Sequence, residues 1–214
     1  MKFDAQIALE AALKLLDEVG IEKVTMRALA TALGVQAPSL YYYYQSRQAL
    51  LDAIAETLAR SALEGIDRHA ALGDLPEAMA RSLRDALLKV RDGARVFSGS
   101  YSPTPSVLGF SDRLIAALVA QGRDVESAVH TAFNIVYYVV GLAIEEQAFL
   151  QKWGGVEHAG DRETARFNLE AQVTNLYPAL KNGLPTIMAA DFDTRLTQGL
   201  QGLLNVKPNS QLMS

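Results

Sequence analysis

The sequence contains no cysteine, which excludes disulfide bonds and thiolate metal sites and is compatible with a reducing cytosol. Proline is scarce, at seven of 214 residues, and alternating strand patterns are missing, so the expected fold class is all-α. No apolar run of membrane-spanning length and no secretory leader stand out. We therefore expect a soluble, cytoplasmic protein without membrane contact, with one large core and a small second module.

Positive charge is not in excess. The formal net charge is −4, and residues 1–60 carry six basic and seven acidic side chains. Because DNA-binding surfaces favour basic residues, this total argues mildly against DNA binding. Placement matters more than the total, since Arg27 and Arg47 flank the segment that would meet DNA. Charge alone neither proves nor excludes a nucleic-acid partner.

Residues 25–47 carry the most specific pattern in the chain. Thr25 is a suitable N-cap for a short helix with an apolar stripe, and Gly34 allows a sharp turn after it. Pro38 fits the first turn of a second short helix, where its missing N–H costs nothing, and Leu40 faces inward. The pattern predicts a helix-turn-helix, in which the second helix enters the DNA major groove.

Apolar residues recur at helical spacing along the rest of the chain. The expected helices are 4–19, 46–71, 76–91, a short one ending near 101, 106–120, 124–151, 164–180 and a last one from 191, with a polar loop over 154–163. We expect a helix-turn-helix domain at 1–46, an effector-binding and dimerisation domain at 47–206, and a disordered tail at 207–214. Helix 46–71 connects the two domains. Helix 124–151 is apolar nearly all the way round, so a partner subunit is expected to cover one face.

With its helix-turn-helix and larger helical body, the chain resembles the TetR family of one-component transcriptional repressors. The matching segments are Gly20-Ile21-Glu22, Thr25-Met26-Arg27, Leu33-Gly34-Val35, Pro38-Ser39-Leu40-Tyr41-Tyr42 and Leu50-Leu51-Asp52; Arg91-Asp92-Gly93-Ala94-Arg95-Val96, Gly141 and Glu145 are more weakly similar to the tetracycline repressor subfamily. The resemblance implies a homodimer held by a four-helix bundle, to which each subunit gives helix 124–151 and its last helix. It also implies an effector cavity whose filling releases DNA.

Phe97 departs from that subfamily, since it stands where the tetracycline repressors place a histidine for the drug-bound magnesium. Leu63, Met79 and Leu114 stand where they use polar residues against the drug. Glu145 remains, but a lone carboxylate is a poor magnesium site. The three histidines lack metal-ligand spacing, and no catalytic motif stands out. We expect no metal, no cofactor and no enzymatic activity.

The expected DNA contacts gather around the second short helix. Arg27 matches the O6 and N7 edge of guanine, whereas Thr25, Tyr41 and Arg47 are better placed for phosphates. The other members of the set are Ala37, Pro38, Ser39, Tyr42 and Tyr43. The alternative is that one or two of the four consecutive tyrosines, Tyr44 above all, pack in the core.

A second, mostly aromatic set is expected to line an effector cavity in the body. It comprises Phe97, Ser100, Tyr101, Phe110, Leu114, Asn134, Tyr137 and Tyr138, with Trp153 as a further candidate. Asn134 belongs to it because an amide inside an apolar helix needs a partner. The alternatives are that the aromatics pack in the core, and that Glu145 pairs with Lys152 or Arg95 instead of a ligand.

These residues lead to one principal hypothesis. The protein is expected to be a repressor that leaves a near-palindromic operator when a small hydrophobic or aromatic ligand binds. Its dimer would place two recognition helices about one duplex turn apart, ~34–36 Å. A ligand-dependent activator, and a helical small-molecule-binding protein without operator specificity, remain as alternatives.

Overall fold

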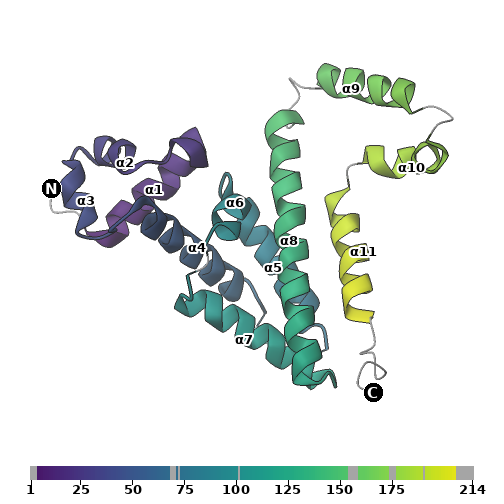
Figure 1. The fold of residues 1–214 in the computed structure, drawn as a ribbon, viewed down its shortest axis with the longest axis horizontal. Coiled ribbons are helices and arrows are strands. Elements are labelled where there is room, and N and C mark those ends of the chain that lie inside the picture. Colours follow the sequence, from purple (N-terminus) through teal and green to yellow (C-terminus); the bar gives the residue numbers. More distant parts are fainter. Residues whose placement is uncertain are drawn as a thin grey trace.

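The computed structural model describes residues 4–67, 71, 73–100, 102–153, 159–173, 177–189 and 191–205, and these residues form helices without any strand (Figure 1). In chain order the elements are α1 (Ala5–Val19), the 3₁₀ turn η1 (Ile21–Lys23), α2 (Met26–Leu33), α3 (Ala37–Tyr41), α4 (Arg47–Glu64), α5 (Leu75–Leu88), α6 (Gly93–Ser98), α7 (Pro105–Ala120), α8 (Val125–Trp153), α9 (Ala159–Gln172), α10 (Pro178–Ala189) and α11 (Phe192–Asn205). The predicted all-α fold class is confirmed.

Capping residues next to them in the sequence fix where the N-terminal helices begin and end. Asp4 caps α1 by accepting the backbone N–H of Ile7 at 2.9 Å. Thr25 caps α2 in the same way, through the N–H of Ala28 at 3.1 Å. Gly34 ends α2 in the left-handed conformation, at φ 67°, where a side chain would be strained. The order α2, Gly34, α3 is the predicted helix-turn-helix.

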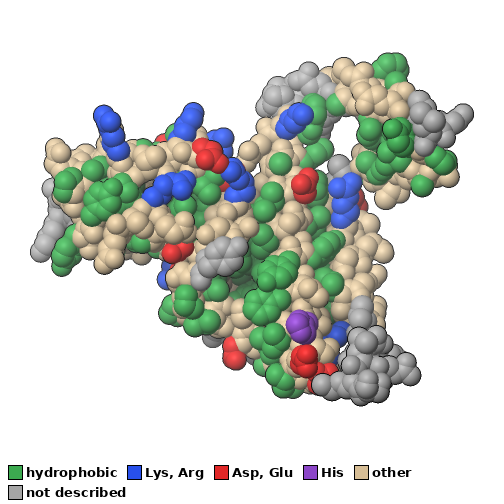
Figure 2. Space-filling model, in the orientation of Figure 1, with side chains coloured by type: hydrophobic (Ala, Val, Ile, Leu, Met, Phe, Trp, Pro, Cys, Tyr) green, Lys and Arg blue, Asp and Glu red, His purple; other side chains and the backbone are tan. Residues whose placement is uncertain are grey.

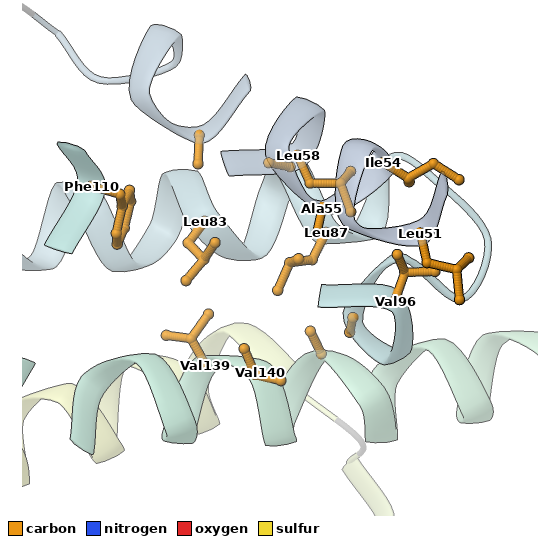
Figure 3. Close-up of a cluster of buried hydrophobic side chains, with 14 of the residues drawn as sticks. Leu51, Ile54, Ala55, Leu58, Leu83, Leu87, Val96, Phe110, Val139 and Val140 are labelled. Atoms are coloured by element: carbon orange, nitrogen blue, oxygen red, sulfur yellow. The ribbon is translucent and has the colours of Figure 1, made fainter. Parts of the chain in front are cut away.

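α4 connects this small module to the body (Figure 1). Its apolar face packs against α5, α6 and α7. Figure 3 shows the buried cluster that results, in which side chains of α4 meet side chains of α5, α6, α7 and α8; the labelled members are Leu51, Ile54, Ala55, Leu58, Leu83, Leu87, Val96, Phe110, Val139 and Val140. One continuous core therefore runs from the module into the body.

α4 ends at Glu64 instead of the predicted residue 71. The chain turns at Gly65 because α5 passes close by. A Cβ at position 65 would lie 2.5 Å from Oγ of Ser82, and that hydroxyl donates to the carbonyl of Ala62 at 2.6 Å. The helix is stopped by a residue distant in sequence, which the local pattern does not reveal.

α8 is the long central helix, and it packs against α5, α6, α7 and α11. At 29 residues and a mean hydropathy of 1.5 over its most apolar stretch, it is long and apolar enough to cross a membrane, so the expectation that no such run exists is wrong. Its packing supplies another reason for that composition, because a helix covered on several sides must be apolar on several sides. Phe133 and Tyr137 nevertheless remain 46% and 66% exposed, and Figure 2 shows hydrophobic side chains along this part of the surface.

The segment after α8 differs from the prediction. Residues 159–163, expected to be a loop, belong to α9, and the single expected helix 164–180 is divided between α9 and α10. Pro178 begins α10, where its missing N–H breaks no bond. None of the described side chains of α9 and α10 is buried, and Figure 1 shows both helices standing away from the body. Without a buried stripe, the sequence does not mark where they begin and end.

Gly199 sets the distance between α11 and α8. Tyr138 of α8 lies across it and donates its hydroxyl hydrogen to the carbonyl of Arg195. A Cβ at position 199 would lie 2.1 Å from the tyrosine ring, whereas a Cβ at Gly202 of the same helix would meet nothing within 4 Å. The close approach of the two helices therefore depends on the missing side chain at 199.

We expect Gly199→Ala to lower the free energy of unfolding by about 1–3 kcal/mol, because the methyl group pushes Tyr138 out of its place. Gly202→Ala is the matched control, and it should raise the free energy of unfolding by up to about 1 kcal/mol through helix propensity. Urea unfolding of the two variants measures both values. Equal effects would show that Tyr138 does not need the gap.

Candidate DNA-binding surface and ligand cavity

One side of α3 in the helix-turn-helix is exposed, and its opposite side is buried in the core of the module. Leu40 is fully buried and fixes α3 on the core of the module. Pro38 and Ser39 of the same helix are exposed, and Ala37 at its start is half-buried. Tyr42, directly after the helix, is 84% exposed. A large aromatic side chain so exposed is available to a partner molecule.

The four consecutive tyrosines divide between surface and core. Tyr41 is 48% exposed, and Tyr43 is half-buried with its ring edge-on to that of Tyr42, 5.1 Å between centroids. Tyr44 is buried and donates its hydroxyl hydrogen to the carbonyl of Ala5 at 2.8 Å. Burial also raises the pKa of Tyr44. Of the two possibilities left by the sequence, core packing holds for Tyr44 and not for Tyr42.

The side chain of Arg47, predicted to contact a DNA phosphate, forms hydrogen bonds within its own chain. Its guanidinium donates from Nε to the carbonyl of Val24 and from Nη2 to the carbonyl of Ile21, both at 2.6 Å. These bonds fasten the start of α4 to the turn that precedes α2. Thr25 also uses its hydroxyl within the chain, as the cap of α2, although its side chain is exposed. Arg27 is exposed on α2.

A cavity of about 420 Å³ lies in the body, between the end of α6, α7 and α8. Five of the predicted ligand-binding residues line it, namely Phe97, Ser100, Phe110, Leu114 and Tyr137. Sequence reasoning missed Phe133, Gly141 and a group of aliphatic residues; these include Val107, Ile115, Val136, Val140 and Ile144. The missed residues on α8 follow helical spacing from Phe133 onward, which was the available signal, but core residues show the same spacing.

Two predicted residues, Asn134 and Tyr138, are not among those that line this cavity, and a third cannot be placed. Tyr101 lies outside the described residues. Asn134 is exposed on α8 instead of buried beside a ligand. Tyr138 is directed toward α11, where it packs on Gly199. Both α8 residues lie on other sides of the helix because its rotation is set by its packing partners.

Glu145 is exposed on α8, and its two predicted partners interact with other groups. Arg95 pairs with Glu22 and with Asp92. The ammonium group of Lys152 lies 4.8 Å from the centre of the Trp153 ring. In the described part of the chain, neither predicted pair of Glu145 forms.

The cavity wall is neutral. Aromatic and aliphatic side chains make up most of it, with the hydroxyls of Ser98, Ser100 and Ser111 among them. None of the described residues that line it carries a full charge at neutral pH. Because an uncompensated charge is costly to bury, these walls suit a neutral, largely apolar molecule with a few polar groups.

A buried carboxylate joins the small module to the body. Asp92, between α5 and α6, is 5% exposed and adopts a left-handed backbone at φ 56°. It accepts the backbone N–H of Ile21 at 2.9 Å and the side-chain amide of Gln151 of α8 at 3.2 Å. Desolvation alone would raise the pKa of Asp92, but these hydrogen bonds and the charge of Arg95 hold the pKa below its ordinary value.

Two family descriptions match the chain in succession. "Bacterial regulatory proteins, tetR family" matches residues 8–54, and "Tetracyclin repressor-like, C-terminal domain" matches residues 70–205. The first match contains α2 and α3, and the second contains the helices that enclose the cavity.

Individual relatives agree. The class A tetracycline repressor from transposon 1721 of Escherichia coli is 34% identical over 203 residues, 93% of this chain and 88% of that protein. The crystal structure of a possible TetR family transcriptional regulator from Streptomyces coelicolor A3(2) matches with a TM-score of 0.82 and 36% identity, over 94% of this chain and 97% of that one. BioQ, crystallised with its double-stranded DNA operator, matches with a TM-score of 0.65 and 32% identity, over 70% of this chain and 89% of that one.

The fold and these sites define a regulator that combines a helix-turn-helix with a helical body. More specifically, the chain belongs to the TetR family of DNA-binding transcriptional repressors, close to the tetracycline repressor subfamily. Its relatives are transcriptional regulators and not enzymes.

Asp92→Asn tests the charge at the junction, because asparagine accepts the same N–H of Ile21 and tolerates the left-handed backbone. Since the folded-state pKa is lowered, the carboxylate stabilises the fold above its unfolded-state pKa, and this contribution is lost as pH falls through the folded-state pKa. Between roughly pH 6 and pH 3, the melting temperature of the unaltered protein should fall more than that of Asp92→Asn. Exposed Glu64→Gln is the control, expected to parallel the unaltered protein. Parallel curves for Asp92→Asn would contradict the assignment.

Proposed function

We propose that the protein is a homodimeric repressor that binds a near-palindromic DNA operator in the cytoplasm and leaves it when a small neutral ligand binds. The observation that carries the DNA-binding part is the exposed surface of α2 and α3, with Tyr42 at 84% exposure. The proposed contacts are Thr25, Arg27, Ala37, Pro38, Ser39, Tyr41, Tyr42 and Tyr43. Arg47 is left out because its guanidinium faces carbonyl groups of its own chain. The operator complex of BioQ supports this assignment by similarity.

The proposed DNA-binding domain comprises residues 1–46, and its contacts have different tasks. Arg27 has a planar fork that matches the two acceptors of a guanine edge. Ala37 and Pro38 offer small apolar surfaces to thymine methyl groups, and Tyr41 offers a hydroxyl to a phosphate. Specificity would then rest on few base contacts, with phosphate contacts fixing the register.

The proposed dimer uses α8 and α11, which pack together within one chain. Phe133 and Tyr137 of the cavity wall also remain exposed on α8, as does Leu150 of the same helix, and large exposed apolar surfaces mark interaction sites. Two copies joined about a twofold axis would form a four-helix bundle and cover part of this surface. The same axis would place the two α3 helices ~34–36 Å apart, which is one duplex turn.

The proposed ligand is neutral and aromatic or hydrophobic. Phe97 lines the cavity at the position where a drug bound through a metal ion would need a side chain that coordinates the metal. The polar side-chain groups of the wall are hydroxyls. We infer binding by apolar contact and hydrogen bonds, without a metal ion. A ligand that fits best when the two DNA-binding modules stand further apart or closer together shifts the dimer away from the operator spacing.

Arg27→Ala should weaken operator binding by about tenfold or more, because one bidentate base contact contributes about 1–3 kcal/mol. Tyr42→Ala should weaken it as well, because it removes a large exposed aromatic contact from the same surface. Both side chains are exposed, so the melting temperature should stay nearly unchanged. The duplex is first selected from a random pool on the unaltered protein, and gel shifts at fixed salt then compare the variants. Thr57→Ala on α4 is a control outside the surface. Selection that yields no preferred sequence, or variants that unfold the module, would refute the DNA-binding assignment.

Nile red, a neutral aromatic dye, should bind the cavity and raise the melting temperature of the protein. Gly141 lines the cavity and has open space at its Cβ, so Gly141→Phe should fill it and weaken dye binding by about tenfold or more. Ala148→Phe adds the same ring on α8 away from the cavity lining and should leave the dye affinity unchanged. Equal affinities in both variants would place the dye elsewhere and contradict the assigned site.

A further inference from the structure

The polar side chains of the described cavity wall are the hydroxyls of Ser98, Ser100 and Ser111 and the phenol of Tyr137. A hydroxyl has one hydrogen that it can donate and two lone pairs that can accept. When its hydrogen is already used within the protein, it offers a ligand acceptor capacity only. The hydrogen-bond partners of these hydroxyls therefore indicate which polar groups a ligand can carry.

The hydrogen of the Ser100 hydroxyl is used by Asp52 of α4. Oγ of Ser100 donates to Oδ1 of Asp52 at 2.9 Å. A hydrogen bond to a charged acceptor is stronger than one between neutral groups. Ser100 would lose this bond if it turned its hydrogen toward a ligand, so it faces the ligand as an acceptor.

Gln48 fixes the direction of the bond between Ser100 and Asp52. The amide nitrogen of Gln48 donates to the carbonyl of Gly99 at 3.2 Å, and a carbonyl can only accept, so the nitrogen of the amide lies on this side. The same nitrogen donates to Oδ1 of Asp52 at 2.8 Å. Because an ionised carboxylate is an acceptor only, the hydrogen between Asp52 and Ser100 must come from Ser100.

The other hydroxyls of the wall are less restricted. Ser111 donates to the carbonyl of Val107 at 3.0 Å, within α7. By helical spacing that carbonyl also accepts the backbone N–H of Ser111, so the hydroxyl can turn away at small cost. Ser98 and Tyr137 are exposed, and water competes for their hydroxyls. Ser100 is half-buried and bound to a carboxylate, which makes it the hydroxyl with the most fixed polarity.

This fixed polarity discriminates between polar groups on a ligand. A ligand O–H or N–H opposite Ser100 completes a chain of hydrogen bonds from the ligand through Ser100 to Asp52, and bonds in such a chain strengthen one another. A ligand ether or carbonyl oxygen at the same place meets lone pairs and gains no bond. It can gain one only if Ser100 gives up its bond to the carboxylate, which removes the benefit.

We propose that the cavity selects ligands that carry a hydrogen-bond donor, and that Ser100, held as an acceptor by Asp52, is the residue that selects them. The proposal rests on the proposed function, because it concerns the same cavity. It narrows the neutral ligand class to aromatic or hydrophobic molecules with a phenolic or alcoholic O–H or an N–H.

The experiment compares two pairs of naphthalenes, each substituted at the β-position, as competitors of bound Nile red. The hydroxyl and methyl compounds have nearly the same shape, but only the hydroxyl compound can donate. The methoxy and ethyl compounds also have nearly the same shape, and the methoxy oxygen can only accept. The ratio of affinities within each pair is compared between protein variants, so that differences in hydration of the free compounds cancel.

In Ser100→Ala, the preference for the hydroxyl over the methyl compound should fall by about tenfold, because one hydrogen bond is lost. Ser100→Thr keeps the hydroxyl and should keep the preference. Ser111→Ala removes the other half-buried hydroxyl and should change the preference by less than about threefold. Nile red has no O–H or N–H, so its own affinity should be the same in Ser100→Ala and in the unaltered protein.

Asp52→Ala tests what holds the hydrogen of Ser100. Without the carboxylate this hydrogen is free to bind a ligand acceptor, so the preference for the methoxy over the ethyl compound should rise by about fivefold or more. Glu64→Ala removes an exposed carboxylate from the same helix and should leave both ratios unchanged. Circular dichroism shows whether each variant is folded. Should Asp52→Ala fail to fold, the comparison of Ser100→Ala with Ser100→Thr decides.

The outcomes separate the proposal from the function on which it rests. If Ser100→Ala leaves the preference for the hydroxyl compound unchanged, or if folded Asp52→Ala gives the methoxy compound no advantage, the proposal is refuted and the cavity stands. The same holds if Gly141→Phe weakens dye binding but no naphthalene displaces the dye. If Gly141→Phe leaves dye binding unchanged, the cavity is not the ligand site, and the ligand part of the proposed function fails.

Discussion

The arrangement of the whole molecule depends on how α8 holds the turn between α5 and α6. The side-chain amide of Gln147 is buried in α8 and donates to the carbonyls of Leu87 and Val90, at 3.0 and 2.8 Å, at the end of α5. Its oxygen accepts the N–H of Ala94 at the start of α6. One amide therefore binds three backbone groups at helix ends; the carbonyl of Val90 also accepts the N–H of Gly93, whereas a buried backbone group left without any partner would cost about 1–3 kcal/mol. Gly93 completes the turn, since a Cβ there would lie 2.4 Å from the carbonyl oxygen of Leu87.

From this turn the constraint passes to the DNA-binding module. Asp92 of the turn accepts the N–H of Ile21, and the backbone N–H of Arg91 donates to the carboxylate of Asp17 at 2.7 Å. The module is thus fixed at its rear to the body, while α4 holds it from the side through Arg47. Two separate attachments leave the module no independent hinge. Any displacement of α4 relative to the α5–α6 turn must change the orientation of the module, which suits the proposed function, in which a ligand alters the separation of two such modules.

The parts of the fold that follow from local chemistry were predictable from the sequence. The cap Thr25 and the turn at Gly34 depend only on neighbouring residues, and they lie where the sequence places them; α1 begins at Ala5, one residue after the predicted start, because Asp4 is its cap. The end of α4 was not predictable, because it depends on Ser82 of another helix. The same holds at the cavity, where five predicted residues line the wall but Tyr138 turns toward Gly199. Aliphatic wall residues and core residues share one spacing, and only the packing of whole helices separates them.

Arginines of the body partly offset the unfavourable charge of the N-terminal segment. Residues 1–60 contain more acids than bases, which opposes approach to DNA. One of those acids, Glu22, pairs with Arg95 of the body, and the guanidinium of Arg91 lies beside Asp17 and Glu18, where it donates to their backbone carbonyls. A count restricted to the segment leaves these arginines out, because they lie far along the chain. The acids at the rear of the module are therefore partly neutralised, while Arg27 on α2 remains exposed toward solvent. The field that DNA meets is set by this arrangement, so a net charge of −4 is compatible with an operator-binding surface.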